Sequence, residues 1–533
     1  MHIGLSSSRR DQAALHLLII NSFHDFMQYM PNMTTRLAGN ITLNPLDHFP
    51  PSNYTYFCSY LTLKDGATPA EVVDVLQEAL RRTFTQLPWL SGKVCLQSSS
   101  VPGWRPGQLE IRYDTADFEG NVPLRQLRVK HLDPEEVGMS YEDLKEGGFP
   151  LNVFEDEQLT AGDLLLRYED SPDCLSAQAN FMEGACLFLI ATQHAACDGT
   201  SYFDVWKIFA TNCDYLQRPG SPWPEPPSAE STDRTILDHI WKGEGTGTPM
   251  AHVKADSWSL LDLQMPGAPE PKAPTSFMTL SDESMQAALF YISPENFSAL
   301  QKRCAKNSPP GMNVSSNDAL SALIWRCMMR AKQKAKQKAA LAGNRISTSG
   351  ADLDTAEARL FMTHDARPDI SQSMPMLYLG NLFFVNILGM PLNTLTAPET
   401  SLAQIAQAIR SVLNKATPQA LLDAYTLAKE VDDLNRIRLK RGHTPNSLDI
   451  VISSLLMFPV EGVKFGGRVF ANGGLPDAVR PLMRRFNRAS QFSFVLPRKP
   501  YGGVEFVLNL FDDEMDILLE DEEFGESCMH YSF

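Results

Sequence analysis

The chain has 533 residues, of which 43% are hydrophobic and 21% are charged, and its formal net charge at pH 7 is −16. This length exceeds one ordinary hydrophobic core, so at least two domains are expected, and the composition is that of a folded globular protein. The acidic balance argues against nucleic acid as a partner, because phosphate binding needs a basic surface.

The sequence contains no evident segment for membrane insertion or secretion. No stretch approaches the roughly 20 apolar residues that a membrane helix needs. The apolar run at 13–20 contains His16 and lacks a small-residue cleavage site. The nine cysteines are scattered, with no C-x-x-C pair, which is typical of reduced and buried thiols. We therefore expect a cytoplasmic protein with no membrane partner.

The first part of the chain predicts strands and helices in alternation. Residues 1–42 show no clear period and are expected to form an N-terminal appendage. A helix is expected to start at Thr68, with Pro69 in its first turn, and to stop before Pro88. Strands are expected at 56–63, 108–113, 163–168 and 186–193, the last followed by a helix that ends near residue 216.

Two proline-rich stretches, 218–227 and 265–274, divide the chain. Proline lacks a backbone donor and fixes the backbone, so neither stretch can form a helix interior or a central strand. With roughly one helix between them, they predict a crossover over 217–283. This crossover separates an N-terminal half, 43–216, from a C-terminal half, 284–533.

The C-terminal half again mixes strands and helices. Strands are expected at 287–292, 360–363, 448–453 and 503–510, and helices after Ser293 and Ser315, over roughly 400–435, and at 512–520. The basic end of the long helix, 332–338, is either a solvated helix end favoured by the dipole or a group of cations near a phosphorylated ligand. The sequence has no G-x-G-x-x-G, P-loop or repeat, so the expected architecture is two α/β or α+β halves with a cleft between them.

The stretch around His194 carries the clearest chemical signal. An apolar run of strand length ends at this histidine, and Asp198 and Gly199 follow it before a helical pattern. A buried strand that leads into a tight turn would hold the imidazole rigidly at the edge of a cleft. An imidazole of near-neutral pKa is suited to remove a proton from a hydroxyl. Asp198 could orient the ring, or it could pair with a distant arginine and fix the loop.

Other interpretations of this stretch remain open. His194 could be a core histidine that is satisfied by a backbone carbonyl. A metal site needs a third ligand, and because no H-E-x-x-H or cysteine cluster supplies one, no metal is expected. Cys197 is a weak candidate for a nucleophile, because its neighbour His194 is only three residues back on the same turn.

The segment 193–199 resembles the His-X-X-X-Asp-Gly motif of the BAHD acyltransferases, CoA-dependent enzymes of plant and fungal specialised metabolism. Other segments resemble family motifs in the same order along the chain: Leu43-Asn-Pro-Leu-Asp47, the run 87–93, the helix start 316–325, Asp365-Ala-Arg367-Pro368, Tyr378-Leu-Gly-Asn381 and Ile452-Ser-Ser454. The long fungal trichothecene-type O-acetyltransferases are the most similar members.

This resemblance implies two chloramphenicol-acetyltransferase-like domains, each a mixed sheet with flanking helices, with a channel between them. An acyl group would pass from acyl-CoA to the hydroxyl of a specialised metabolite, with His194 as general base. Acetyl is the expected acyl group, because it is the usual one in the family. Asp198 would bind Arg367 and, with Gly199, hold the loop. Acyl-CoA would be a co-substrate, with no permanently bound cofactor, and the protein would be a monomer.

The resemblance also suggests residues for the CoA arm or the substrate: Ser316, Asn317, Asn381, Ser453 and Ser454. The alternative for Ser316 and Asn317 is that they cap the start of a helix. The alternative for Ser453 and Ser454 is that they are ordinary hydroxyls at the end of a strand.

One family motif departs from its usual form. The late D-F-G-W-G is expected near 464–467 or at 473–480, but Lys464 stands in place of the aspartate and the tryptophan is absent. This departure puts the geometry of the local loop and the coenzyme site in question, although not the chemistry. A non-catalytic relative that binds a metabolite is therefore one alternative. A peptide-synthetase condensation domain is another, although Gln193 stands where that class usually has a second histidine.

Overall fold

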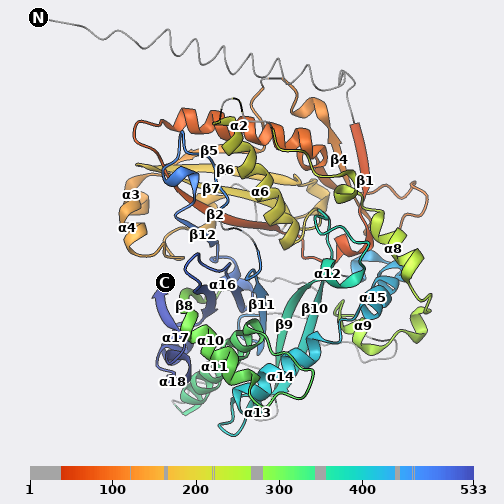
Figure 1. The fold of residues 1–533 in the computed structure, drawn as a ribbon, viewed down its shortest axis with the longest axis vertical. Helices are drawn as coiled ribbons and strands as arrows, with labels where there is room; N and C mark the ends of the chain where they lie inside the picture. The colour runs from red at the N-terminus through yellow and green to blue at the C-terminus, as the bar shows by residue number, and fades with distance from the viewer. Residues whose placement is uncertain are drawn as a thin grey trace, which may run out of the picture.

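The structure is a computed structural model that describes residues 38–120, 122–160, 166–218, 220, 223–263, 265, 280–341, 356–437, 444–458, 460 and 462–533. The strands of these residues form sheets of five, seven and three strands. Figure 1 shows the five-stranded sheet in one body of the molecule and the seven-stranded sheet in the other, each with helices packed against it. The predicted α/β class, with a mixed sheet and flanking helices in each half, is confirmed.

The five-stranded sheet carries the predicted histidine strand at its centre. Its order is β12 (Ala478–Pro481), β2 (Tyr54–Thr62), β7 (Ala185–Gln193), β6 (Leu175–Met182) and β5 (Leu127–His131). Every residue of β7 is buried, and the strand is antiparallel to both β2 and β6. Helices α2 (Pro69–Gln86) and α6 (Gly199–Leu216) lie side by side over this sheet (Figure 1). A strand with both faces covered reads as a continuous apolar run, which is how β7 appears in the sequence.

The start of α2 shows how the local sequence sets an element. The Thr68 hydroxyl accepts a hydrogen bond from the Glu71 amide, and the Glu71 carboxylate accepts one from the Thr68 amide at 2.9 Å. Pro69 occupies the first turn, where its missing donor costs nothing. The predicted start and end of this helix are confirmed.

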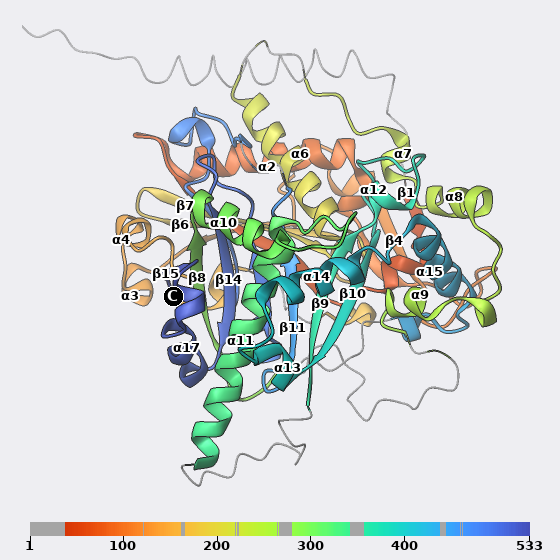
Figure 2. The ribbon, with the colours of Figure 1, turned by 60° about the horizontal axis from the view of Figure 1, so that its bottom comes forward.

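The seven-stranded sheet belongs to the second half of the chain. Its order is β10 (Phe383–Pro391), β9 (Glu357–Asp365), β11 (Asp449–Ser454), β13 (Phe492–Val495), β14 (Val504–Leu510), β8 (Gln286–Ile292) and β15 (Met529–Ser532). Helices α10 (Pro294–Ala305), α11 (Ser316–Leu341), α14 (Leu402–Leu413) and α17 (Asp512–Leu519) pack on one another and on this sheet (Figure 2). The buried Trp325 and Phe290 lie in the core between them.

The smallest sheet corrects the prediction for the start of the chain. Residues 38–42, expected to be irregular, form β1 (Ala38–Thr42), which pairs with β4 (Leu109–Asp114); β3 (Lys93–Leu96) pairs with the other edge of β4. No residue of β1 is fully buried, so an apolar pattern does not mark this strand. Residues 1–37, and residues 163–165 of the strand expected at 163–168, lie outside the described residues. Tyr168, at the expected end of that strand, begins the 3-10 helix Tyr168–Asp170 instead.

The crossover differs from the prediction of roughly one helix. Its described residues form α7 (Ala229–Thr232), α8 (Ile236–Glu244) and α9 (Ala255–Ser259), and the last two pack against α15 (Pro418–Glu430) of the second half. In the other direction, β12 leaves the second half and completes the five-stranded sheet beside β2. The boundaries 43–216, 217–283 and 284–533 stay a prediction, and the paired strands show that the halves are joined by backbone hydrogen bonds.

The cysteines agree with the prediction. All nine cysteines are buried and unbridged, as predicted. None of the helices within the described ranges has the length and hydropathy needed to cross a membrane.

The basic end of α11 is neither uniformly solvated nor uniformly available to a ligand. Lys332 is fully buried, and its Nζ lies 3.0 Å from Oε1 of Glu514 on α17. Burial lowers the pKa of Lys332, although the Glu514 carboxylate acts in the opposite direction. Lys334, two residues further along, is exposed. Lys332 therefore joins two helices of the core.

We predict that Lys332→Met lowers the free energy of unfolding by about 3 kcal/mol, because it leaves the Glu514 carboxylate buried without its charge partner. Lys334→Met on the same helix is the matched control and should change stability by less than about 0.5 kcal/mol. Urea denaturation followed by tryptophan fluorescence measures both. Equal midpoints for the two variants would show that the buried pair does not stabilise the fold.

Candidate active site

His194 sits where the central strand β7 meets a tight turn. Its backbone amide donates to the Asn53 carbonyl at 2.9 Å, which extends the pairing of β7 with the segment before β2. The Gln193 side-chain oxygen accepts hydrogen bonds from the amides of Ala195 and Ala196 at 2.6 and 3.2 Å. The turn is therefore fixed by the side chain that precedes the histidine. Gln193 is fully buried, and sequence reasoning did not assign it this role.

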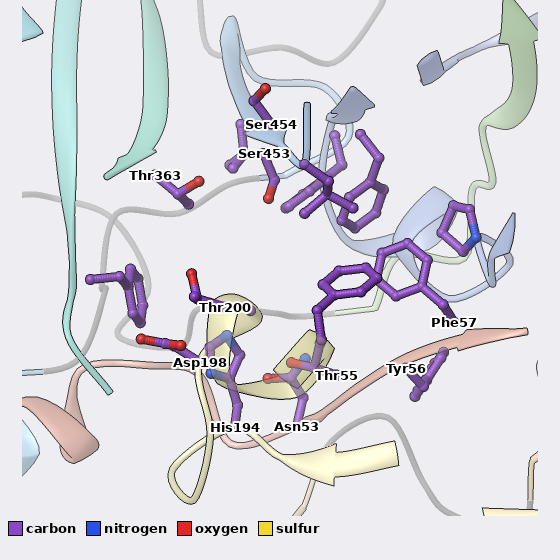
Figure 3. Close-up of a pocket in the computed structure, with 18 of the residues that line it drawn as sticks. Asn53, Thr55, Tyr56, Phe57, His194, Asp198, Thr200, Thr363, Ser453 and Ser454 are labelled. Atoms are coloured by element: carbon purple, nitrogen blue, oxygen red, sulfur yellow. The ribbon is translucent and has the colours of Figure 1, made fainter. Parts of the chain in front are cut away.

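The imidazole of His194 points into a cavity, toward Thr200 (Figure 3). The Phe383 ring packs against it with 5.6 Å between centroids. Its Nδ1 is buried and has no hydrogen-bond partner among the described residues. Enclosure by protein lowers the pKa of His194 below its ordinary value of 6.5, although the backbone around the ring and the Asp198 carboxylate act in the opposite direction. The ring is therefore neutral at pH 7, as a general base must be.

Asp198 anchors the turn. Its carboxylate accepts hydrogen bonds from the amides of Ser201, in the first turn of α6, at 2.9 Å and of Leu382 at 2.8 Å. The Arg367 guanidinium lies 2.9 Å from the same carboxylate, and both side chains are almost completely buried. The expected pair between Asp198 and Arg367 is therefore present. Of the two roles considered for Asp198, these contacts favour fixing the loop, because no hydrogen bond joins the carboxylate to the His194 ring.

Arg367 has more partners than this one carboxylate. Its guanidinium donates to the carbonyls of Tyr378 and Gly380, at 2.8 Å each, and to the Asp365 carboxylate at 2.7 Å. Burial alone would lower the pKa of Arg367, but Asp198 and Asp365 outweigh it and raise the pKa. The cation is therefore permanent, and it joins the turn after His194 to two segments of the second half.

A second buried network holds the other side of the same turn. Asp47 is fully buried and accepts hydrogen bonds from Arg234 at 2.9 Å and from the Asn381 amide and side chain at 3.0 Å. Arg234 and Asn381 also donate to the carbonyls of Ala196 and Ala195, next to His194. The motifs 43–47 and 378–381 signalled two members of this network. Arg234 lies in the crossover, where no sequence pattern marked it.

The cavity is enclosed by both halves of the chain and measures about 190 Å³. The first half contributes residues of β2 and of the turn after β7. The second half contributes residues of β9, β10, β11 and β13. Figure 3 shows Ser453 and Ser454 across the open space from His194.

The structure brings some of the predicted site residues together and places others elsewhere. His194, Asp198, Gly199, Ser453 and Ser454 line the cavity. Arg367 lies behind Asp198, fully buried. Ser316 and Asn317 are in the first turn of α11 and do not line it. Asn381, expected to contact CoA or substrate, is fully buried in the Asp47 network, so its place is structural.

Residues 157–525 of the chain match a family described as "Transferase family", and residues 53–213 match the "Trichothecene 3-O-acetyltransferase-like N-terminal domain". The chain belongs to the Transferase family. The resemblance to the BAHD acyltransferases is thereby confirmed, and it extends through both halves of the molecule.

The individual proteins to which the chain is similar are distant relatives. The chain is 25% identical to trichothecene 3-O-acetyltransferase TRI101 of Fusarium sporotrichioides, over 92% of this chain and 97% of that protein. It is 27% identical to the isocyanide synthase-NRPS hybrid crmA of Aspergillus fumigatus and 28% identical to the enoyl-CoA isomerase/hydratase claC of Penicillium crustosum, in both cases over 91% of this chain. The chain spans only 31% and 50% of the length of these two proteins.

Solved structures show the same fold. The structure of F. graminearum TRI101 complexed with coenzyme A and deoxynivalenol matches with a TM-score of 0.71 and 21% identity, over 93% of this chain and 100% of that one. The first condensation domain of the CDA synthetase matches with a TM-score of 0.50 and 14% identity, over 92% and 98%. The two-body fold is therefore shared by these proteins.

The structure shows how the loop near Lys464 is held although the family's aspartate is absent there. Lys464 is exposed, whereas Phe465 beside it is fully buried in the core of the first half. The Gln217 side chain holds this loop by donating to the Phe465 carbonyl at 2.6 Å and accepting from the Arg468 amide at 2.9 Å. Gly466 has φ +95° and lies against Gln217, a position where a side chain would clash. The loop is therefore fixed by an amide side chain without an aspartate at position 464.

Within the part of the chain that the structure describes, no group of three or more His, Cys, Asp or Glu side chains is placed to hold an ion.

We predict that Asp198→Ala destabilises the protein by about 3 kcal/mol, because it leaves the buried Arg367 cation without one of its two carboxylates. Asp198→Asn should recover part of this loss, since asparagine also caps a helix start. Asp369→Asn is the control: its exposed carboxylate, two residues beyond Arg367, lies 3.0 Å from His364 Nε2, and the loss of such an exposed contact should change stability by less than about 1 kcal/mol. Thermal unfolding measures all three. An Asp198→Ala protein as stable as the wild type would contradict an anchoring role.

Proposed function

We propose that the protein transfers an acyl group, most simply acetyl, from acyl-CoA to a hydroxyl of a small specialised metabolite. The observation that carries this proposal is a neutral imidazole at the wall of a cavity enclosed by both halves of the chain. Family membership supports acyl transfer, and several relatives are named as O-acetyltransferases. The TRI101 structures hold coenzyme A together with a mycotoxin, which supports a CoA thioester and an alcohol as the two substrates.

In the proposed reaction, the cavity-facing nitrogen of His194 takes the proton of the acceptor hydroxyl as its oxygen attacks the thioester carbonyl carbon. The new C–O bond gives a tetrahedral intermediate with a negative oxygen. This intermediate collapses by breaking the C–S bond, and the imidazolium returns the proton to the departing thiolate. The products are the ester and free CoA, and the protein forms no covalent intermediate.

The surrounding residues take supporting roles in this proposal. Asp198, Gly199 and Arg367 hold the turn so that the ring stays aimed into the cavity. Ser453 and Ser454 lie at the end of β11, across the cavity from the ring, where their hydroxyls could hydrogen-bond the amides of a pantetheine arm (Figure 3).

We predict that His194→Ala reduces kcat with acetyl-CoA and an accepted alcohol by roughly a hundredfold or more, the range expected for loss of a general base. The His194→Ala protein should retain the wild-type affinity for CoA, measured by calorimetry. His239→Ala, which removes an exposed histidine of α8, is the control. Release of free CoA, measured with a thiol reagent, reports the rate. Full activity of His194→Ala would refute the assigned base.

We predict that kcat/KM falls at acidic pH with a midpoint below 6.5. The neutral imidazole is the active form, and burial lowers the pKa of His194, so activity is retained until the pH falls below the ordinary range. Asp204 also titrates in this range, because burial raises its pKa to about 6. The Asp204→Asn variant should keep the same acid limb. A midpoint above 6.5, or loss of the limb in that variant, would assign the titration to another group.

A carrier-bound thioester is a second candidate for the acyl donor. Two observations favour it: the fold is shared with a condensation domain, and one relative is a much longer NRPS hybrid of which this chain spans 31%. The two candidates differ in the acyl donor. The rate of transfer from acetyl-CoA should therefore be compared with the rate of transfer of the same acyl group from a carrier protein. Transfer from the carrier alone would replace the CoA proposal.

A further inference from the structure

One wall of the cavity is a continuous cluster of phenyl rings. Its members are Phe57, Phe203, Phe458, Phe486, Phe492 and Phe494. The Phe57 ring lies 5.2 Å from Phe203 and 5.7 Å from Phe494, between centroids. Phe203 stacks on Phe458 at 4.8 Å, and Phe494 lies 4.5 Å from Phe492. These rings come from β2, α6, the segment after β11, α16 (Phe486–Ala489) and β13, so both halves of the chain build the cluster.

The described lining of the cavity offers no cationic side chain to an anionic group. None of the described residues that line it is a lysine or an arginine. Its carboxylates are already engaged, Asp198 with Arg367 and Asp365 with both Arg367 and the Thr200 hydroxyl at 2.9 Å. A carboxylate or phosphate on a ligand would enter this space without a cationic partner and close to two negative charges. An uncharged ligand avoids both costs.

Four hydroxyl groups of the cavity lie apart from this cluster, although Phe361 and Phe383 also line the cavity and Phe383 packs against His194. Figure 3 shows Thr200, Thr363, Ser453 and Ser454 on one side of the open space and Phe57, the centre of the cluster, on the other. Hydroxyl groups suit the amides of a pantetheine arm. The aromatic side then remains for the acceptor, with the imidazole between the two.

We infer that the acceptor is an uncharged hydroxylated aromatic compound, bound with its ring against this cluster and its hydroxyl toward His194. The inference rests on the proposed acyl transfer and adds the class of the second substrate. Aromatic rings gain about 0.5–1.5 kcal/mol in edge or offset contacts beyond the burial of apolar area. This corresponds to a preference of about threefold to tenfold over a saturated ring of the same size.

The direct test uses three matched alcohols with acetyl-CoA and the wild-type protein: 2-naphthylmethanol, its decahydro counterpart, and 6-(hydroxymethyl)-2-naphthoate. We expect kcat/KM for the naphthyl alcohol to exceed that of the saturated alcohol about threefold to tenfold. The carboxylate should be at least about a hundredfold poorer. Equal rates for the aromatic and saturated alcohols, or a preference for the carboxylate, would overturn the inference.

Variants test whether the cluster is the source of this preference. Phe494→Leu and Phe458→Leu should each lower the ratio of naphthyl to decahydro kcat/KM, whereas Phe511→Leu, a half-buried phenylalanine outside the cavity, should leave the ratio unchanged. A general loss of folded protein lowers kcat/KM for both alcohols by the same factor, so it leaves their ratio unchanged. An unchanged ratio in both cavity variants would contradict the assignment. So would a strong preference for benzoyl-CoA over acetyl-CoA, since the cluster would then hold the acyl group.

A separate readout keeps the two proposals distinguishable. Calorimetry with 2-naphthylmethanol and its decahydro counterpart measures binding without any reaction. Tighter binding of the aromatic alcohol, with no CoA release from any acceptor, would reject the proposed acyl transfer and support the aromatic site. Absence of binding and of transfer to the naphthyl alcohol would reject the inference.

Discussion

The buried ion pair between Asp198 and Arg367 is the interaction on which the site depends. Two charges removed from water stabilise a fold only if hydrogen bonds satisfy them and their geometry is good. Both conditions hold here, because Asp198 also accepts two backbone amides and Arg367 also donates to two backbone carbonyls. The pair joins the turn after β7 to the segments around β9 and Gly380, so it sets where His194 faces the second half.

Asp47 and Arg234 form a second buried pair on the opposite side of the same turn. The two arginines of these pairs therefore lie outside the cavity, where protein groups satisfy them. The cavity itself is lined by an imidazole, hydroxyls, aromatic rings and the paired carboxylates of Asp198 and Asp365. Enclosure by protein keeps the pKa of His194 low, although the Asp198 carboxylate acts in the opposite direction. None of the described residues that line the cavity is a lysine or an arginine, which suits an uncharged acceptor.

The sequence predicted the parts of the fold that local patterns determine. The α2 cap at Thr68 and the apolar strand β7 were expected from residue types and spacing, and the pairing of Asp198 with Arg367 was expected from the family resemblance. Strand β12 was not, because a four-residue edge strand that crosses between halves has no apolar period. The place of Asn381 also could not be predicted from local sequence. Its motif marks it as a family position, but only the tertiary structure shows that its side chain contacts Asp47 rather than the cavity. The sequence did not predict the aromatic cluster, because its rings come from five separate segments.

In the proposed reaction, His194 lies between a thioester and an alcohol that meet in a cavity shared by both halves. A crystal structure of the protein with coenzyme A and a bound alcohol would test this placement. We expect the CoA sulfur and the alcohol oxygen both to lie within hydrogen-bonding reach of the cavity-facing nitrogen of His194. A CoA molecule whose sulfur lies outside this cavity, with the imidazole in contact with neither substrate, would contradict it.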